Sequence, residues 1–285
     1  MNAARQLKCF RTSSVPLHAG AKAVHAQRAR IRSDMIRSRR QLMIAGQRNL
    51  SRILHNFFTQ KIEAVCTWFE QRAHYASADV PMTKTAELDI HLGAHEALWR
   101  QAIEEVLGAD ADIELVMDYQ PAVQSVAAKA YDRTVTFLGE EAVHDASSII
   151  LRRSITLAQQ VTRINDTTKA NLNRVIQQSM ADGLTIRETV DAVRSSIPEI
   201  ASARIPTIAR TEIGRAVDQG TMQAIKESAV VKTVCVVGCQ AVEPGIPTFD
   251  GRPTCNITGV DAQRVDELEF HPNHGGVIVP ESFYE

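Results

Sequence analysis

The sequence predicts a mainly α protein in which helical N-terminal and middle regions precede a small α+β domain at the C-terminus. Apolar residues recur at helical spacing from about residue 50 to residue 225. The first clearly β-branched run, Val230–Val237, comes only after them. The remaining segment is rich in Pro and Gly and closes with a second short strand, Val277–Pro280.

The composition is that of an ordinary globular chain of 285 residues, of which 44% are hydrophobic and 23% are charged. No apolar run reaches the roughly 18 residues that a membrane-spanning helix needs. Five cysteines in a chain of this length do not indicate a disulfide framework, so we expect reduced thiols. No motif of a nucleotide-binding loop, a hydrolase elbow or a zinc protease occurs, and we therefore expect no enzymatic activity.

Charge is distributed unevenly along the chain. Residues 1–62 contain thirteen Lys or Arg and one acid, Asp34, whereas residues 63–285 contain nineteen basic and thirty-two acidic residues. Each clustered Arg can neutralise one phosphate, so this arm is a candidate DNA-binding segment. A solvated basic tail and an Arg-rich mitochondrial transit peptide are the two alternative interpretations. The densest cluster comprises Arg28, Arg30, Arg32, Arg37, Arg39 and Arg40.

The helices are predicted from apolar spacing and capping residues. An amphipathic stripe from Leu50 to Phe69 indicates either core packing or contact with a partner helix. Further helices are expected over residues 88–108 and from Pro121, because a proline suits the first helical turn. Asp166 or Thr167 is expected to cap the next helix.

That helix is expected to end at Gly183, which can take the left-handed conformation of a C-terminal cap. Thr185 and Glu188 form a capping box for its successor, which is predicted to stop at the break that includes Pro198. A long helix is then expected from Ser202 to about Glu227.

Several segments of the C-terminal half occur in a recognisable order. They are a capped helix pair, a helix bearing Ile-Ala-Arg-Thr-Glu, a strand, a loop ending in Thr-Cys, a His-Pro-Asn turn and a short strand ending in Pro. With this order, residues 150–285 resemble the phage Mu F-like minor head proteins, also called phage head-morphogenesis proteins. The matching residues are Ile164–Pro198, Ile208–Glu212 with Ala216 and Gly220, Gly251–Cys255, His271–His274 and Val277–Pro280.

The resemblance implies a low-copy structural component of the virion that assembles in the host cytoplasm. Members of the family associate with the portal and other head proteins, and some accompany DNA. On this basis the chain divides into a basic arm with the start of the amphipathic helix (1–62), a helical region (63–165) and a Mu F-like domain (166–285). The alternatives are a Mu F-like toxin or effector module with an enzymatic role, and a nucleic-acid-binding module.

A candidate zinc site is formed by Cys239, Cys255, His271 and His274. Thiolate and imidazole are the usual ligands of zinc, and a turn at Pro272 brings the Cα atoms of the two histidines within about 7 Å. Buried thiols and turn-capping histidines are the alternative. The family usually has a second Cys where Thr258 lies, and a Cys at the position of His274.

The Arg-Thr-Glu segment also raises the question of a catalytic Arg/Glu pair. Arg210 and Glu212 are two residues apart, so on a helix their side chains point about 200° apart. We therefore expect them to have structural roles.

Overall fold

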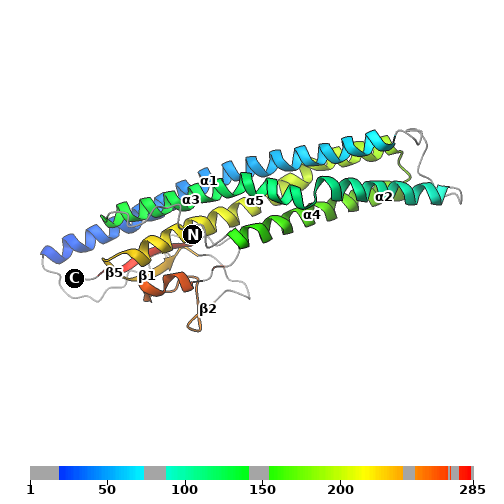
Figure 1. Ribbon diagram of the computed structural model, residues 1–285. Helices are drawn as coiled ribbons and strands as arrows, with labels where there is room; N and C mark the ends of the chain where they lie inside the picture. The colour runs from blue at the N-terminus through cyan, green and yellow to red at the C-terminus, as the bar shows by residue number, and fades with distance from the viewer. Residues whose placement is uncertain are drawn as a thin grey trace, which may run out of the picture. The chain divides into compact units, whose positions relative to one another are not determined.

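The computed structural model describes residues 19–73, 88–140, 154–239, 248–268, 270 and 276–283. Within these residues, five long α-helices precede a few short strands, which confirms the expected mainly α fold with a small α+β region at the C-terminus (Figure 1). The helices are α1 (Ala19–Ala73), α2 (Leu88–Val106), α3 (Ala109–Leu138), α4 (Ser154–Ala181) and α5 (Ile186–Glu227). The strands are β1 (Val231–Val237), β2 (Thr248–Phe249), β3 (Arg252–Pro253), β4 (Val260–Asp261) and β5 (Val277–Phe283), with a 3₁₀-helix η3 (Ala262–Glu267).

The chain forms two compact units, and each combines segments that are distant in sequence. The sheet-bearing unit consists of Met1–Asn49, Ala122–Arg152 and Thr207–Glu285. The helical unit consists of Leu50–Pro121 and Arg153–Pro206. This division differs from the three consecutive regions predicted from the sequence, because the unit boundaries fall inside the long helices α1, α3 and α5.

The core of the helical unit is built by α1, α2, α4 and α5. Phe69 and Trp99 stack with their ring centroids 3.8 Å apart, and both side chains are buried. Within the predicted amphipathic stripe, Leu50, Leu54 and Phe57 are buried in the chain itself, so the stripe packs in the core. The cluster of fully buried residues comprises Ile62, Val65, Cys66, Phe69, Trp99, Ala102, Ile103, Leu107, Leu172, Val190 and Val193.

The connection between α4 and α5 has the local structure that the sequence predicts. Gly183 has a φ of +71°, and the backbone N–H of Leu184 donates to the carbonyl of Ser179, 3.0 Å away. Thr185 and Glu188 form the expected capping box, in which the Thr185 N–H donates to Glu188 Oε2 at 2.8 Å. In return, the Glu188 N–H donates to Thr185 Oγ1 at 3.2 Å.

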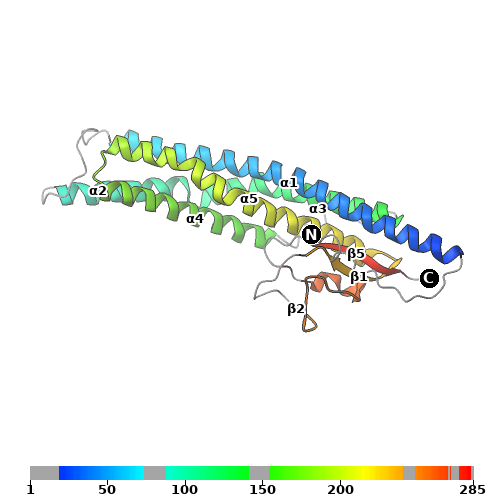
Figure 2. The same cartoon turned by 180° about the vertical axis from the view of Figure 1, so that it is seen from behind.

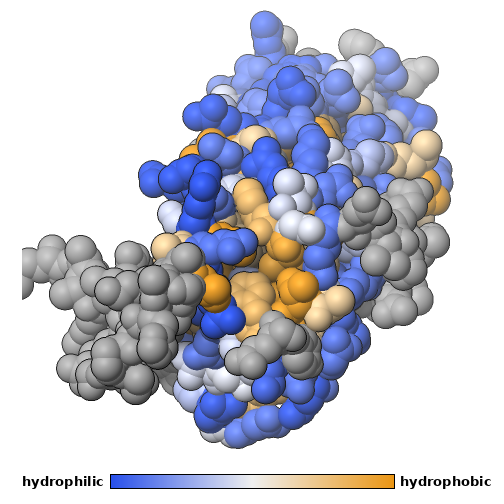
Figure 3. Space-filling view, turned by 90° about the vertical axis from the view of Figure 1, so that its left-hand side faces the viewer, coloured by the Kyte–Doolittle hydropathy of each residue, from blue (hydrophilic) through white to orange (hydrophobic). Residues whose placement is uncertain are grey.

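The sheet-bearing unit places an antiparallel sheet of order β4–β1–β5 against the helices α1 and α5 (Figures 1 and 2). Every residue of β1 except Lys232 is at least half-buried, and Val234 pairs with Val260 and with Pro280. Met35 of α1 and Ile225 of α5 belong to the same core cluster as β1. A small hairpin of β2 and β3 adds Phe249 to that core. Figure 3 shows apolar side chains gathered on one face, with hydrophilic side chains around them.

Helices α3 and α5 approach each other closely at Gly220. A Cβ atom at this position would lie 2.1 Å from the carbonyl oxygen of Ala127 and 2.9 Å from the backbone nitrogen of Tyr131. Only a residue without a side chain fits between these backbones. Gly220, which is among the residues that carry the family resemblance, therefore has a packing role.

Several predicted helix boundaries are wrong. The basic arm is helical from Ala19, so α1 starts long before Leu50. Pro121, Pro198 and Pro206 all lie inside helices, where each removes one backbone donor but does not end the helix. Asp166 lies inside α4, so it does not cap the helix. Gly139, with a φ of +73°, follows the last residue of α3; residues 141–153 are outside the described residues.

Candidate nucleic-acid interface

The structure separates the six predicted arginines into two groups. Three of them contact α5 or β5. The guanidinium of Arg39 is buried and pairs with Asp218 of α5 at 2.9 Å, and only 8% and 6% of the two side chains are exposed. Arg32 donates to the backbone carbonyls of Pro280 and Glu281 on β5, at 2.6 and 2.7 Å.

Arg28 completes the first group because its guanidinium lies over the ring of Phe283, 5.1 Å from the centroid. Arg28, Arg32 and Arg39 therefore attach α1 to β5 and α5. These contacts involve guanidinium groups that we predicted from the sequence to bind phosphate. For these three residues a structural role is the better interpretation.

Arg30, Arg37 and Arg40 form the second group and point to solvent. Their exposed side-chain fractions reach 85% for Arg30 and 70% for Arg37. Arg48 is exposed on the same helix, although the sequence analysis did not include it in the site. At about 100° per residue, Arg30, Arg37 and Arg48 lie within roughly 20° of one another around α1.

These four residues, Arg30, Arg37, Arg40 and Arg48, are called the arginine ridge below. Arg30 and Arg48 are separated by about 27 Å along the helix, at 1.5 Å per residue. Asp34 is the acidic neighbour, with a carboxylate 3.3 Å from Arg37 and 3.9 Å from Arg30. Asp34 offsets one of the four positive charges, so the ridge with this neighbour keeps a net formal charge of +3 (four Arg less one Asp). The sequence signal that could have separated these arginines from Arg39 is their angular position around the helix: Arg39 lies about 180° from Arg30 and Arg48.

Half of the predicted zinc set is brought together, but as a disulfide. Cys239 and Cys255 are bonded to each other, and their Cα atoms are 5.3 Å apart. Gly238, with a φ of +79°, turns the chain after β1, and the N–H of Val236 donates to Ile257 at 2.9 Å. The turn and this backbone hydrogen bond bring the two cysteines together, and their spacing in the sequence does not predict that proximity.

Sulfurs bonded to each other cannot supply the two thiolates that a Cys₂His₂ zinc site requires. At this pair, therefore, the structure corrects the expectation of reduced thiols and does not fit a metal. His271 and His274 lie outside the described residues, so the four-residue zinc set as a whole stays a prediction. Within the described ranges, no group of three or more His, Cys, Asp or Glu side chains is arranged to hold a metal ion.

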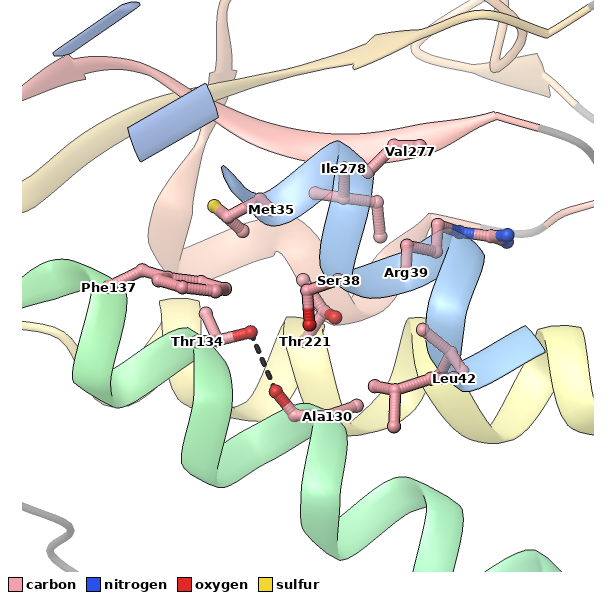
Figure 4. Close-up of a pocket in the computed structure, with 11 residues that line it drawn as sticks. Met35, Ser38, Arg39, Leu42, Ala130, Thr134, Phe137, Thr221, Val277 and Ile278 are labelled. Atoms are coloured by element: carbon pink, nitrogen blue, oxygen red, sulfur yellow. Dashed lines mark hydrogen bonds between the residues drawn. The ribbon is translucent and has the colours of Figure 1, made fainter. Parts of the chain in front are cut away.

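A small pocket lies between α1, α3, α5 and β5 in the sheet-bearing unit (Figure 4). Its polar groups are the hydroxyls of Ser38, Thr134 and Thr221, and the guanidinium of Arg39 points away from its centre. Thr134 donates to the carbonyl of Ala130 at 2.7 Å, and Ser38 accepts from Arg133 at 3.1 Å. The lining contains no carboxylate or imidazole that would activate a hydroxyl.

Arg210 and Glu212 lie on different sides of α5, as expected. Arg210 is exposed, whereas Glu212 is buried and accepts from Arg215 at 2.9 Å. The buried Ala209 and Ile213 flank this segment. Ala209 and Glu212 of the Ile-Ala-Arg-Thr-Glu motif are therefore buried, whereas Arg210 is exposed, and the two charged groups do not converge on one site.

Among the helices that the structure describes, none is long and apolar enough to cross a membrane. The sequence matches no family model, no curated protein and no solved structure.

Proposed function

We propose that this chain is a structural component of a phage head, present in low copy and associated with the portal, which acts in head assembly and genome packaging or delivery. The order of motifs over residues 150–285 suggests this function. The observation that supports the proposal most directly is that residues of the motif pack in the helices. Ala209 and Glu212 are buried in α5, and Gly220 allows the close approach of α3.

Packing of these three motif residues between and within helices supports a structural role. An enzymatic toxin or effector module is less well supported. Arg210 and Glu212 diverge, and the hydroxyls of the pocket in Figure 4 have no base beside them.

The proposal is tested with phage particles. A defined prophage or phage carrying this gene is grown, and its purified heads are analysed by quantitative mass spectrometry. We expect the protein to co-purify with the heads at a low, constant ratio to the major capsid protein. Intact heads that lack it would contradict the proposal and favour the enzymatic or nucleic-acid-binding alternative.

We further propose that the arginine ridge contacts duplex DNA through the phosphate backbone. Four exposed arginines lie on α1 between residues 30 and 48, and three of them fall within roughly 20° around the helix, whereas the remainder of the chain is acidic overall. At about 0.9 per neutralised phosphate, four contacts give a slope of log K against log salt of about −3.6. This is shallower than the value of about −5 that six arginines would give.

The DNA contact is tested with a charge-matched control. One variant replaces Arg30, Arg37, Arg40 and Arg48 by Gln; the control replaces the exposed Arg100, Arg163, Arg174 and Arg187. We expect the ridge variant to lose most of the salt dependence with duplexes of unrelated sequence, because phosphate contacts carry no sequence information. Equal losses in both variants would show that total charge, and not the ridge, determines binding.

A further inference from the structure

The large hydrophobic side chains that the described residues expose are concentrated on two helices. Ile113 and Met117 of α3 are 59% and 70% exposed. They are four residues apart, so they are neighbours on one face of the helix. Single exposed hydrophobics are ordinary on a protein surface, but an adjacent pair this exposed indicates an interaction surface.

An acidic row lies beside this pair. Asp110, Glu114 and Asp118 follow one another at intervals of four residues, and all three are exposed. Glu114 also accepts from Lys61 at 2.5 Å. The five residues Asp110, Ile113, Glu114, Met117 and Asp118 are called the α3 patch. It places an apolar pair beside an acidic row, and so fits a helix that carries apolar and basic residues together.

Such a helix face is present on α1 of the same sequence. Ile36, Arg40, Ile44 and Arg48 occur at intervals of four residues, and all are exposed. Ile36 and Ile44 are each 44% exposed. These four residues, called the α1 strip, form one ridge of alternating apolar and basic side chains. Rows at this spacing can interdigitate when two helices cross.

We propose that the α3 patch binds the α1 strip of a second copy of this chain. The apolar side chains would cover one another, while Arg40 and Arg48 would lie near the acidic row. A second copy is the occupant because the complementary charges belong to this sequence: Arg40 and Arg48 are eight residues apart, as are Asp110 and Asp118, and all four are exposed. The contact joins two different surfaces, so it either forms twice in a two-fold dimer or continues head-to-tail in rings or open chains of copies.

Arg40 and Arg48 belong to both the α1 strip and the arginine ridge. Duplex DNA and a second copy therefore compete for α1, and DNA should release the associated form. Only this consequence rests on the proposed DNA contact. Self-association itself is measured without nucleic acid, so failure of one proposal leaves the other to be judged separately.

The test is analytical ultracentrifugation of the full chain over a wide concentration range, combined with charge reversal. One variant carries Arg40→Glu and Arg48→Glu, and the other carries Asp110→Lys and Asp118→Lys. We expect the wild type to associate with increasing concentration and each variant to remain monomeric, because its own two surfaces now repel. An equimolar mixture of the variants should recover association, because the acidic α1 strip of the first variant matches the basic α3 patch of the second. The unchanged α3 patch of the first variant also matches the unchanged α1 strip of the second.

Circular dichroism verifies that both variants keep the helical content of the wild type. A third variant, Ile113→Asn with Met117→Asn, should weaken association at least tenfold without altering the charges. The proposal is overturned if the wild type is monomeric at every concentration. It is also overturned if folded charge variants associate like the wild type, or if their mixture fails to recover association.

Discussion

Replacing Gly220 by alanine tests how closely α3 and α5 are packed. The added Cβ would lie 2.1 Å from the carbonyl oxygen of Ala127, whereas ordinary contacts begin at about 3.4 Å. The obstacle is backbone, so no side-chain rotation relieves it, and the helices must separate locally by about 1 Å. Overpacking of this kind costs about 1–3 kcal/mol.

Helix propensity acts in the opposite direction, since alanine in place of glycine favours a helix by about 1 kcal/mol. Gly214, six residues earlier on α5, separates the two effects. A Cβ at Gly214 would meet only Met43 Cε, at 3.7 Å, which is an ordinary contact. Gly214→Ala should therefore stabilise the protein by up to about 1 kcal/mol. Gly220→Ala should destabilise it by up to about 2 kcal/mol once its propensity gain is subtracted.

Both variants are measured by urea unfolding monitored by circular dichroism, with the wild type in the same series. The expected result is opposite signs, with a midpoint above the wild type for Gly214→Ala and below it for Gly220→Ala. If Gly220→Ala proved as stable as Gly214→Ala, the close approach of α3 to α5 would be refuted.

Three further predictions concern buried and capping groups. Asp218→Ala leaves the guanidinium of Arg39 buried without this carboxylate, so it should lower the free energy of unfolding by about 3–5 kcal/mol in denaturant titrations. The control, Asp34→Ala on the surface, should change the free energy of unfolding by less than about 1 kcal/mol. Burial raises the pKa of Cys66 to about 12, so this thiol should not react with alkylating reagents at neutral pH until the chain is unfolded. Peptide mapping after alkylation measures this, and alkylation of Cys66 in the native protein would contradict its burial. The hydrogen bond from the Thr185 backbone N–H lowers the pKa of Glu188 below its ordinary 4.5, so the cap's contribution is present above that value and is lost as pH falls through the lowered pKa. Glu188→Gln cannot ionise, and its stability difference from the wild type should shrink over that acidic range; a constant difference would refute the ionised cap.

The features that could be predicted from the sequence are local ones. Thr185, Glu188 and Gly183 act within a few residues of themselves, and their spacing alone encodes the caps. The amphipathic stripe around Leu54 was also readable, because a periodic apolar face must be buried somewhere.

The wrong boundaries occur where tertiary packing overrides a local signal. Pro198 and Pro206 usually end helices, but α5 continues through both while its buried face, including Val193 and Ile205, packs in the core. The disulfide between Cys239 and Cys255 was missed for a related reason. The sequence reports their separation of 16 residues, but the turn at Gly238 and the pairing of Val236 with Ile257 set their distance.

The basic arm shows why a count of charges does not define a binding site. Arg39 and Arg40 are adjacent in sequence, but one is buried against Asp218 and the other is exposed. A rotation of about 100° around α1 separates a structural arginine from a candidate phosphate ligand. Deleting the whole arm would therefore remove Arg32, Arg39 and core residue Met35 together with the exposed charges. If such a truncation lost DNA binding, the loss could come from an unfolded sheet-bearing unit or from a missing interface. Substitutions confined to the arginine ridge separate the two causes, because they change the charge and leave the contacts of α1 with α5 and β5 in place.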